Sequence, residues 1–180
     1  MICIFLADGF EMIETLTPCD ILHRAGLDVR LVSVNGKDMV RSTHGVDIKA
    51  DLSLCELDPN SVDMMILPGG MPGAKNLYEC KPLIELLMHH AKEKKPIAAI
   101  CAAPFILGKC GLLNGKKATC YPGFEIDLIG ADHTPCGVVV DSNIITAKGM
   151  GVSLDFSLAI CEMLCGQEKR DAIAQAIMYE

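Results

Sequence analysis

The segment at residues 96–108, PIAAICAAPFILG, most constrains how this chain can fold. Its first part, Ile97 to Ile100, is a short apolar run, typical of a strand buried on both faces inside a parallel sheet. Pro104 opens a second apolar run that favours a helix, because proline is tolerated in the first turn of a helix. Cys101 therefore falls where a strand turns sharply into a helix.

Small residues surround this cysteine on both sides. The pattern Ala99-Ile100-Cys101-Ala102-Ala103 indicates a nucleophile elbow in which Cys replaces Ser. The start of the following helix would supply positive potential and free N–H groups, which favour a thiolate. The alternative is a buried structural cysteine, since free cysteine is among the most buried residue types. This stretch alone leaves both interpretations open.

Apolar runs and helical segments alternate along the rest of the chain. Strands are expected at residues 2–7, 27–34, 63–67, 97–100 and 118–121, two short β pieces at 39–50, and a hairpin at 138–147. Helices are expected at residues 11–25 (with Pro18 inside), 76–94 (with a second segment starting near Pro82), 124–129, 152–165 and 169–178. This alternation predicts one α/β domain over residues 1–180, with a doubly wound, mostly parallel sheet sandwiched by helices. Functional groups are then expected at the carboxyl ends of the strands.

The charge and cysteine content of the chain argue against several classes of function. The formal net charge is −7, which argues against binding to nucleic acid or to an acidic membrane surface. Ten cysteines are present without a C-x-x-C pair, so a structural zinc site is not expected. Neither a signal peptide nor a membrane-spanning segment is expected. The large number of thiols suggests a reducing compartment, the cytoplasm.

Three loops should meet at the carboxyl edge of the sheet: residues 7–11, residues 67–70 and Cys101. Four motifs occur in order along the chain: GFEMIET at 9–15, LPGGMPGA at 67–74, AAICAAP at 98–104 and GMG at 149–151. Together they resemble the ThiJ/PfpI family, in the branch of the parkinsonism-associated protein deglycase. The resemblance implies a flavodoxin-like fold of the class I glutamine amidotransferase type.

The resemblance assigns chemical roles to several residues. Cys101 matches the reactive cysteine, and Glu14 matches its protonated carboxylic acid partner, which needs a raised pKa. Without the resemblance, Glu14 would be interpreted as a solvated helix residue. Gly69, Gly70 and Ala102 match backbone N–H donors that stabilise an oxyanion or a sulfinate.

Two departures from the family pattern limit the mechanism. The proteolytic branch has His directly after the reactive Cys, where this chain has Ala102, so a protease is not expected. Many relatives have His near the site where this chain has Tyr121, a weak base that can still donate a hydrogen bond. His133, expected in a loop, is the remaining candidate for a replacement base. Arg24 and His44 match basic positions that could bind an anion, and both could equally be surface residues.

These features predict a cysteine-dependent enzyme acting on reactive 2-oxoaldehydes through a hemithioacetal on Cys101, with no cofactor and no metal. The alternative is a redox sensor or holdase chaperone in which Cys101 oxidises to a sulfinate held by Glu14. A role in thiazole biosynthesis ranks last, because no phosphate-binding glycine motif is visible. The resemblance also implies a homodimer formed through the first helix, including Ile13 and Asp20. Cys101 should be alkylated before the other thiols, unless exposed ones such as Cys55 react faster through access alone.

Overall fold

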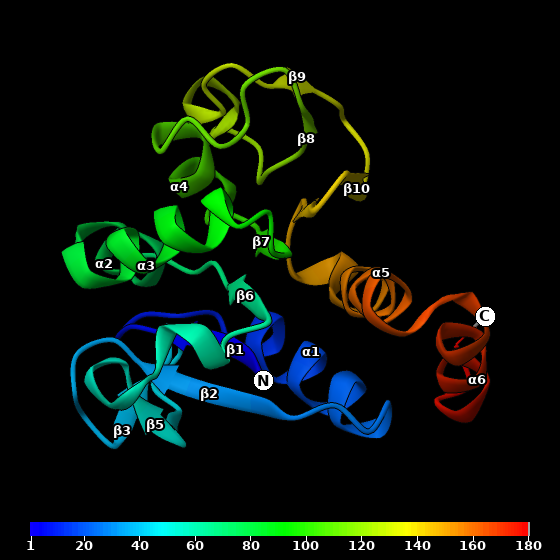
Figure 1. The fold of residues 1–180 in the computed structure, drawn as a ribbon, viewed down its shortest axis with the longest axis horizontal. Coiled ribbons are helices and arrows are strands. Elements are labelled where there is room, and N and C mark those ends of the chain that lie inside the picture. Colours follow the sequence, from blue (N-terminus) through cyan, green and yellow to red (C-terminus); the bar gives the residue numbers. More distant parts are fainter. Residues whose placement is uncertain (180) are drawn as a thin grey trace.

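The computed structural model describes residues 1–179, and its centre is a seven-stranded sheet (Figure 1). The strand order is β10-β11-β7-β6-β1-β2-β5. The strands are β1 (Ile2–Leu6), β2 (Val29–Ser33), β5 (Leu52–Ser53), β6 (Met64–Leu67), β7 (Ile97–Ile100), β10 (Val138–Asp141) and β11 (Ile144–Ala147). Every neighbouring pair is parallel except the β10–β11 hairpin. The predicted mostly parallel sheet is therefore confirmed.

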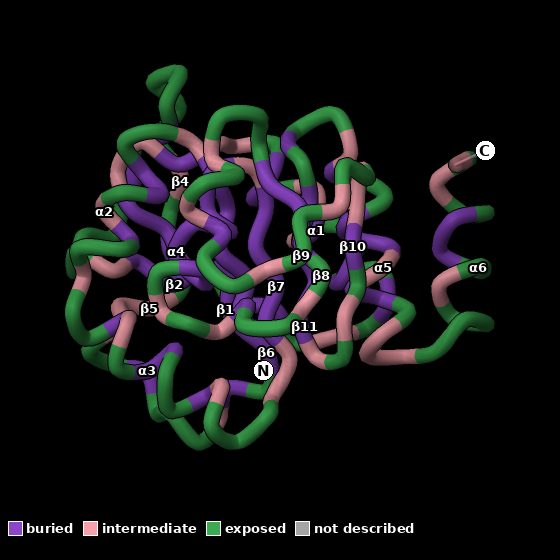
Figure 2. Tube along the Cα trace, turned by 90° about the horizontal axis from the view of Figure 1, so that it is seen from above, coloured by how far each residue is buried: buried purple, intermediate pink, exposed green. Residues whose placement is uncertain are grey.

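The central strands are buried on both faces because they are apolar throughout. Every residue of β1, β6 and β7 is buried, and these strands run through the purple centre of Figure 2. Successive side chains point to opposite faces of a sheet. Accordingly, Ile4 and Leu6 of β1 belong to one core, whereas Cys3 and Phe5 belong to the other. One sheet thus separates two hydrophobic cores.

Helices cover both faces of the sheet, as a doubly wound fold requires (Figure 1). They are α1 (Met12–Arg24), α2 (Gly73–Glu79), α3 (Lys81–Lys92), α4 (Pro104–Lys109), α5 (Ser153–Cys165) and α6 (Gln167–Ala176). The core that contains Cys3 and Phe5 takes its helical residues from α2, α3 and α4, and the core that contains Ile4 and Leu6 takes them from α1, α5 and α6. No helix within residues 1–179 is both long enough and apolar enough to span a membrane.

Several predicted elements differ from the structure in extent. The helical region expected from residue 76 is two helices, because α2 begins at Gly73 and α3 begins at Lys81, next to Pro82. Pro18 lies buried inside a single α1. The helix expected at residues 124–129 is only a 3₁₀ turn, Glu125–Asp127. The two-residue strand β5 was not predicted, since two residues carry no periodicity to detect.

Two small sheets lie outside the main one. Strands β3 (Met39–Arg41) and β4 (Asp47–Lys49) pair around the turn that holds His44, as predicted. The strand expected at residues 118–121 is the shorter β8 (Lys117–Ala118), which pairs in parallel with β9 (Asp132–His133). His133 therefore lies in a short strand and not in a loop.

Candidate active site

The sharp turn predicted at Cys101 is present. Cys101 follows β7 directly and has φ 64°, a left-handed conformation that non-glycine residues adopt only at a cost of about 1 kcal/mol or more. Its backbone is held on both sides. The Cys101 N–H donates to the Ala147 carbonyl at 2.9 Å, and the Tyr121 N–H donates to the Cys101 carbonyl at 2.8 Å. The surrounding structure thus fixes a strained conformation at this cysteine.

Glu14 lies in the first turn of α1 and is 1% exposed. Its backbone N–H donates to the Glu11 carboxylate at 2.8 Å, which caps the helix and fixes where α1 begins. Across the sheet edge, its Oε2 accepts a hydrogen bond from the Gly69 N–H at 2.9 Å. Burial raises the pKa of the Glu14 carboxyl to about 7, as its predicted role requires. A carboxyl with this pKa can exchange a proton near neutral pH.

Cys101 and Glu14 influence each other's ionisation. Burial, followed by the negative charge of Glu14, raises the pKa of the Cys101 thiol to about 12. The elbow was expected to favour a thiolate, but the net shift of the thiol pKa is upward. The backbone N–H groups of Gly70 and Ala102 do stabilise the thiolate, but burial outweighs them. Since two buried anions in contact repel, a thiolate on Cys101 is compatible with a protonated Glu14 and not with an ionised one.

The three predicted backbone donors divide into two roles. Gly70 and Ala102 direct their N–H groups toward the Cys101 sulfur. Gly69 was expected to be a third such donor, but its N–H is taken up by Glu14 and so positions the acid. A Cβ added at position 69 would lie 2.6 Å from Cys101 Cβ and 2.7 Å from Glu14 Oε2. Only glycine fits at this point without displacing one of the two groups.

Tyr121 lies at the mouth of the same site. Its side chain is exposed, and its ring lies beside Gly149. A Cβ added at Gly149 would be 3.4 Å from the Tyr121 ring and 4.0 Å from Glu14 Oε1. That Oε1 atom is buried and has no hydrogen-bond partner among residues 1–179. Tyr121 and the free oxygen of Glu14 thus flank the same glycine.

Sequence reasoning missed one contributor, the backbone of Met150. Its N–H stabilises the ionised form of Glu14, in opposition to burial. The GMG motif at residues 149–151 marked this loop without indicating a role, because a backbone donor leaves no side-chain signal.

Comparison with known proteins identifies the family of this chain. The profile of the DJ-1/PfpI family matches residues 1–163. The chain belongs to the DJ-1/PfpI family. It is 39% identical to Protein DJ-1 homolog B of Arabidopsis thaliana over 166 residues, which cover 91% of this chain and 38% of that protein. The chain spans less than half the length of that relative and of its Arabidopsis counterpart, homolog A.

Two further DJ-1/PfpI relatives have names that describe an activity. A glutathione-independent glyoxalase of Caenorhabditis elegans is 32% identical, over 93% of this chain and 89% of its own length. A deglycase of Pyrococcus abyssi is 34% identical, over 83% of this chain and 90% of its own length. Among solved structures, oxidized DJ-1 of Toxoplasma gondii superposes with a TM-score of 0.95 at 34% identity, covering 99% of this chain and 97% of that one. The fold of this DJ-1/PfpI chain is thereby established.

Two residues predicted from the family pattern lie apart from the Cys101–Glu14 pair within this DJ-1/PfpI chain. Arg24 is at the opposite end of α1, roughly 15 Å along the helix from Glu14, and is paired with Asp20 at 2.7 Å. His44 is in the exposed turn between β3 and β4. Their anion-binding role stays a prediction. Over the described part of the chain, no cluster of three or more His, Cys, Asp or Glu side chains could hold a metal ion.

Proposed function

We propose that this protein converts reactive 2-oxoaldehydes to 2-hydroxy acids, or releases them from glycated adducts, through a covalent hemithioacetal on Cys101. The observation that carries this proposal is the contact between Cys101, on its strained elbow, and Glu14, whose pKa burial raises to about 7. A nucleophile beside an acid that exchanges protons near neutral pH suits aldehyde chemistry. The names of the glyoxalase and deglycase relatives support the same reaction class.

The reaction can be written with methylglyoxal so that its atoms balance. The Cys101 sulfur attacks the aldehyde carbon, and the resulting oxyanion takes up a proton to give a hemithioacetal. Glu14 then removes the proton from that carbon, and a proton is returned to the neighbouring carbonyl carbon, which gives a thioester of lactate. Water cleaves the thioester, releasing lactate and the free thiol. The N–H groups of Gly70 and Ala102 stabilise the negative charge that develops during addition and hydrolysis.

Tyr121 is proposed to donate a proton or hydrogen bond to the substrate carbonyl from the mouth of the site. Its place beside Gly149, across from Glu14 Oε1, supports this role. His133 lies exposed in β9 and is not assigned a part in the reaction.

The test is lactate formation from methylglyoxal in a buffer free of primary amines, since amines react with the aldehyde themselves. Wild type should produce lactate, and Cys101→Ala should not. Cys55→Ala, which removes an exposed thiol, serves as the matched control and should retain full activity. Equal lactate formation by wild type and Cys101→Ala would overturn the proposal.

The second candidate is a redox sensor or holdase chaperone. The similarity to a DJ-1 structure described as oxidized favours it, as does the cradle of N–H groups beside Cys101. In this case peroxide converts Cys101 to a sulfinate, and a protonated Glu14 donates a hydrogen bond to it. Selective sulfinate formation on Cys101, detected by mass spectrometry without lactate production from methylglyoxal, would favour the sensor.

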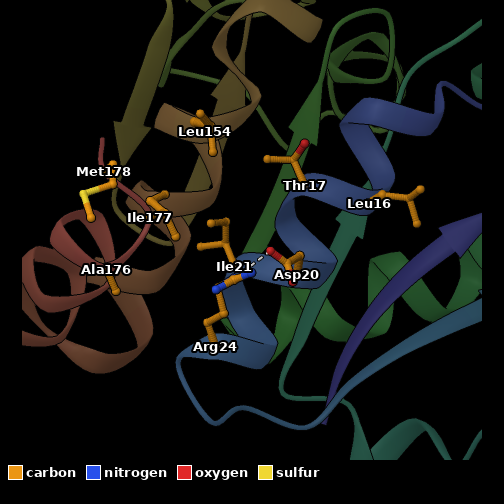
Figure 3. Close-up of a pocket in the computed structure, with 9 residues that line it drawn as sticks. All are labelled: Leu16, Thr17, Asp20, Ile21, Arg24, Leu154, Ala176, Ile177 and Met178. Carbon is orange, nitrogen blue, oxygen red and sulfur yellow. Dashed lines mark hydrogen bonds and ion pairs between the residues drawn. The ribbon is translucent and has the colours of Figure 1, made fainter. Parts of the chain in front are cut away.

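We also propose that the chain forms a homodimer through α1. Ile13 and Leu16 on this helix are each 39% exposed, although both are large apolar residues. Figure 3 shows Leu16, Asp20 and Arg24 around a cavity of about 570 Å³ that also reaches Leu154 and Met178. An apolar surface on α1 that continues into this cavity is suited to contact with a second copy. The ten free thiols suit a reducing compartment such as the cytoplasm. The net charge of −7 argues against a nucleic-acid or acidic membrane partner.

A further inference from the structure

A second cavity opens beside the Cys101–Glu14 pair, and the mechanism above makes no use of most of it. Its volume is about 360 Å³, and it is lined by Tyr121, Pro122 and residues 148–152. We call it the Tyr121–Val152 cavity. Its walls are predominantly apolar, and Lys148 is the single charged residue among those that line it. An apolar cavity of about 150 Å³ already suffices to hold benzene, so there is room here for a ring or a branched chain.

Backbone hydrogen bonds connect Cys101 to the two segments that line this cavity. On one side, the Tyr121 N–H donates to the Cys101 carbonyl at 2.8 Å. On the other, the Cys101 N–H donates to the carbonyl of Ala147, the residue just before the 148–152 segment. The segments that line the cavity are therefore fastened to the backbone of Cys101.

The acid of the pair also faces the cavity. Gly149 separates the Tyr121 ring from Glu14 Oε1, and the Met150 N–H interacts with the Glu14 carboxyl. The reacting carbons of a 2-oxoaldehyde must lie between Cys101 and Glu14. The cavity next to Glu14, lined by Tyr121, Met150 and Val152, is available to its remaining substituent.

We infer that the Tyr121–Val152 cavity binds the substituent of the 2-oxoaldehyde, and that it selects substrates with an aromatic or branched apolar group over glyoxal and methylglyoxal. This inference rests on the proposed function for its substrate class. Met150 is the residue best suited to determine the preference, because it lines the cavity, is 54% exposed and interacts with Glu14 through its backbone N–H. A thioether side chain adapts readily to an aromatic ring.

The experiment compares Met150→Ser with wild type on two substrates that share the reacting group. The kcat/KM for phenylglyoxal, measured as mandelate formed, should fall about fivefold to tenfold, because the apolar contact with the ring is lost. The ratio of kcat/KM for phenylglyoxal to kcat/KM for methylglyoxal should fall by about fivefold on the same grounds, since the methyl group of methylglyoxal reaches little of the cavity. Met88→Ser removes a comparably exposed methionine from α3 and should leave both values unchanged. An equal effect of Met150→Ser on both substrates, or no effect on either, would overturn the inference.

A second readout does not depend on turnover. Cys101 is alkylated with iodoacetamide or with N-phenyl iodoacetamide, and the ratio of the two rates is measured by mass spectrometry. The rate with the phenyl reagent, divided by the rate with iodoacetamide, should be higher at Cys101 than at the exposed Cys55. Met150→Ser should abolish this gain in relative rate. If neither substrate is converted yet this gain is present, the proposed enzyme function fails while the cavity still binds aromatic groups. If both substrates are converted and the gain is absent, the cavity inference fails alone.

Discussion

The backbone N–H of Gly69 donates a hydrogen bond to Glu14 Oε2 at 2.9 Å, linking residues that are 55 positions apart in the chain. This contact fixes one oxygen of the acid and leaves the other, Oε1, without a partner among the described residues. The Glu14 carboxyl is therefore oriented by the loop after β6, while Cys101 is oriented by the turn after β7. The relative position of two strand ends sets the geometry of the pair.

Gly69→Ala should disturb this pair. The added methyl group would lie within 2.7 Å of both Cys101 Cβ and Glu14 Oε2, so the site must shift, at a cost of about 1–3 kcal/mol in the free energy of unfolding. Urea unfolding measures the loss, and lactate formation measures the damage to the site. Gly151→Ala is the control, since nothing lies within 4 Å of a Cβ there. Equal stability of Gly69→Ala and wild type would contradict the predicted clash.

Glu14 should also leave a signature in the pH dependence of stability. Its pKa rises from 4.5 in its ordinary environment to about 7 in the folded protein, so between these values the folded state binds more protons than the unfolded state. The free energy of unfolding should therefore fall as pH rises through this window, by up to about 3 kcal/mol. Glu14→Gln should lack this contribution. Urea unfolding of both proteins from pH 4 to pH 8 checks it, and parallel curves would show that Glu14 does not titrate in this way.

The same substitution should make Cys101 more reactive. The ionised Glu14 carboxylate raises the pKa of the thiol, so replacing it by a neutral amide should lower that pKa and increase the thiolate fraction at pH 8. Iodoacetamide labelling, resolved by peptide, should then be faster at Cys101 in Glu14→Gln than in wild type. The exposed Cys55 in the same sample is an internal control whose rate should not change. Slower labelling of Cys101 in the variant would mean that the acid promotes the thiolate.

Tyr121 can be tested by removing only its hydroxyl. If the phenol donates to the substrate carbonyl, Tyr121→Phe should lower kcat for methylglyoxal by ~10² or more, the usual range for a positioned proton donor. Tyr121→His, which introduces the side chain expected from the family pattern, should keep activity and make it more dependent on pH between 6 and 8. Full activity of the Phe variant would show that the Tyr121 hydroxyl is not needed for the reaction and that this residue only lines the cavity.

The proposed dimer predicts a mass of twice 19.4 kDa in light scattering at micromolar concentration. Leu16→Asp places a charge on the exposed apolar face of α1 and should give the monomer mass, because an unpaired buried charge is costly. Met88→Asp changes a similarly exposed residue on α3 and should remain dimeric. A wild-type mass equal to one chain would remove the dimer from the proposal.

The sequence predicted the fold well wherever apolar runs were long enough to show a period. The elements β1, β6, β7, β11 and α5 were expected close to their observed positions. The two-residue strands β5 and β9 were not, because pairing with a neighbouring strand creates them and no local pattern does. Strand order in the sheet was likewise not predicted, since it depends on contacts between distant segments.

At the candidate site, the motifs predicted that Cys101 and Glu14 are partners, and the structure brings them together beside Gly69. The direction of the thiol pKa was not predicted. Helix position and small neighbours can be inferred from the chain, whereas the degree of burial of a sulfur cannot. For the same reason Gly69 was assigned to the wrong acceptor: its N–H was known to be available, but the place of the Glu14 side chain was not. A role that depends on the surroundings of an atom can be assigned only from the three-dimensional structure.

The backbone of Cys101 is hydrogen-bonded to the Ala147 carbonyl and to the Tyr121 N–H, so this cysteine is an extension of the sheet and not part of a free loop. Segments fastened in this way open only when the surrounding cooperative unit opens. An adduct or an oxygen atom added to the sulfur must therefore be accommodated by rotation of one side chain, while the main chain stays in place. A structural change caused by modification of the sulfur must consequently reach the rest of the protein through the groups in contact with it. Glu14 is the first of these groups, and it lies in the first turn of α1.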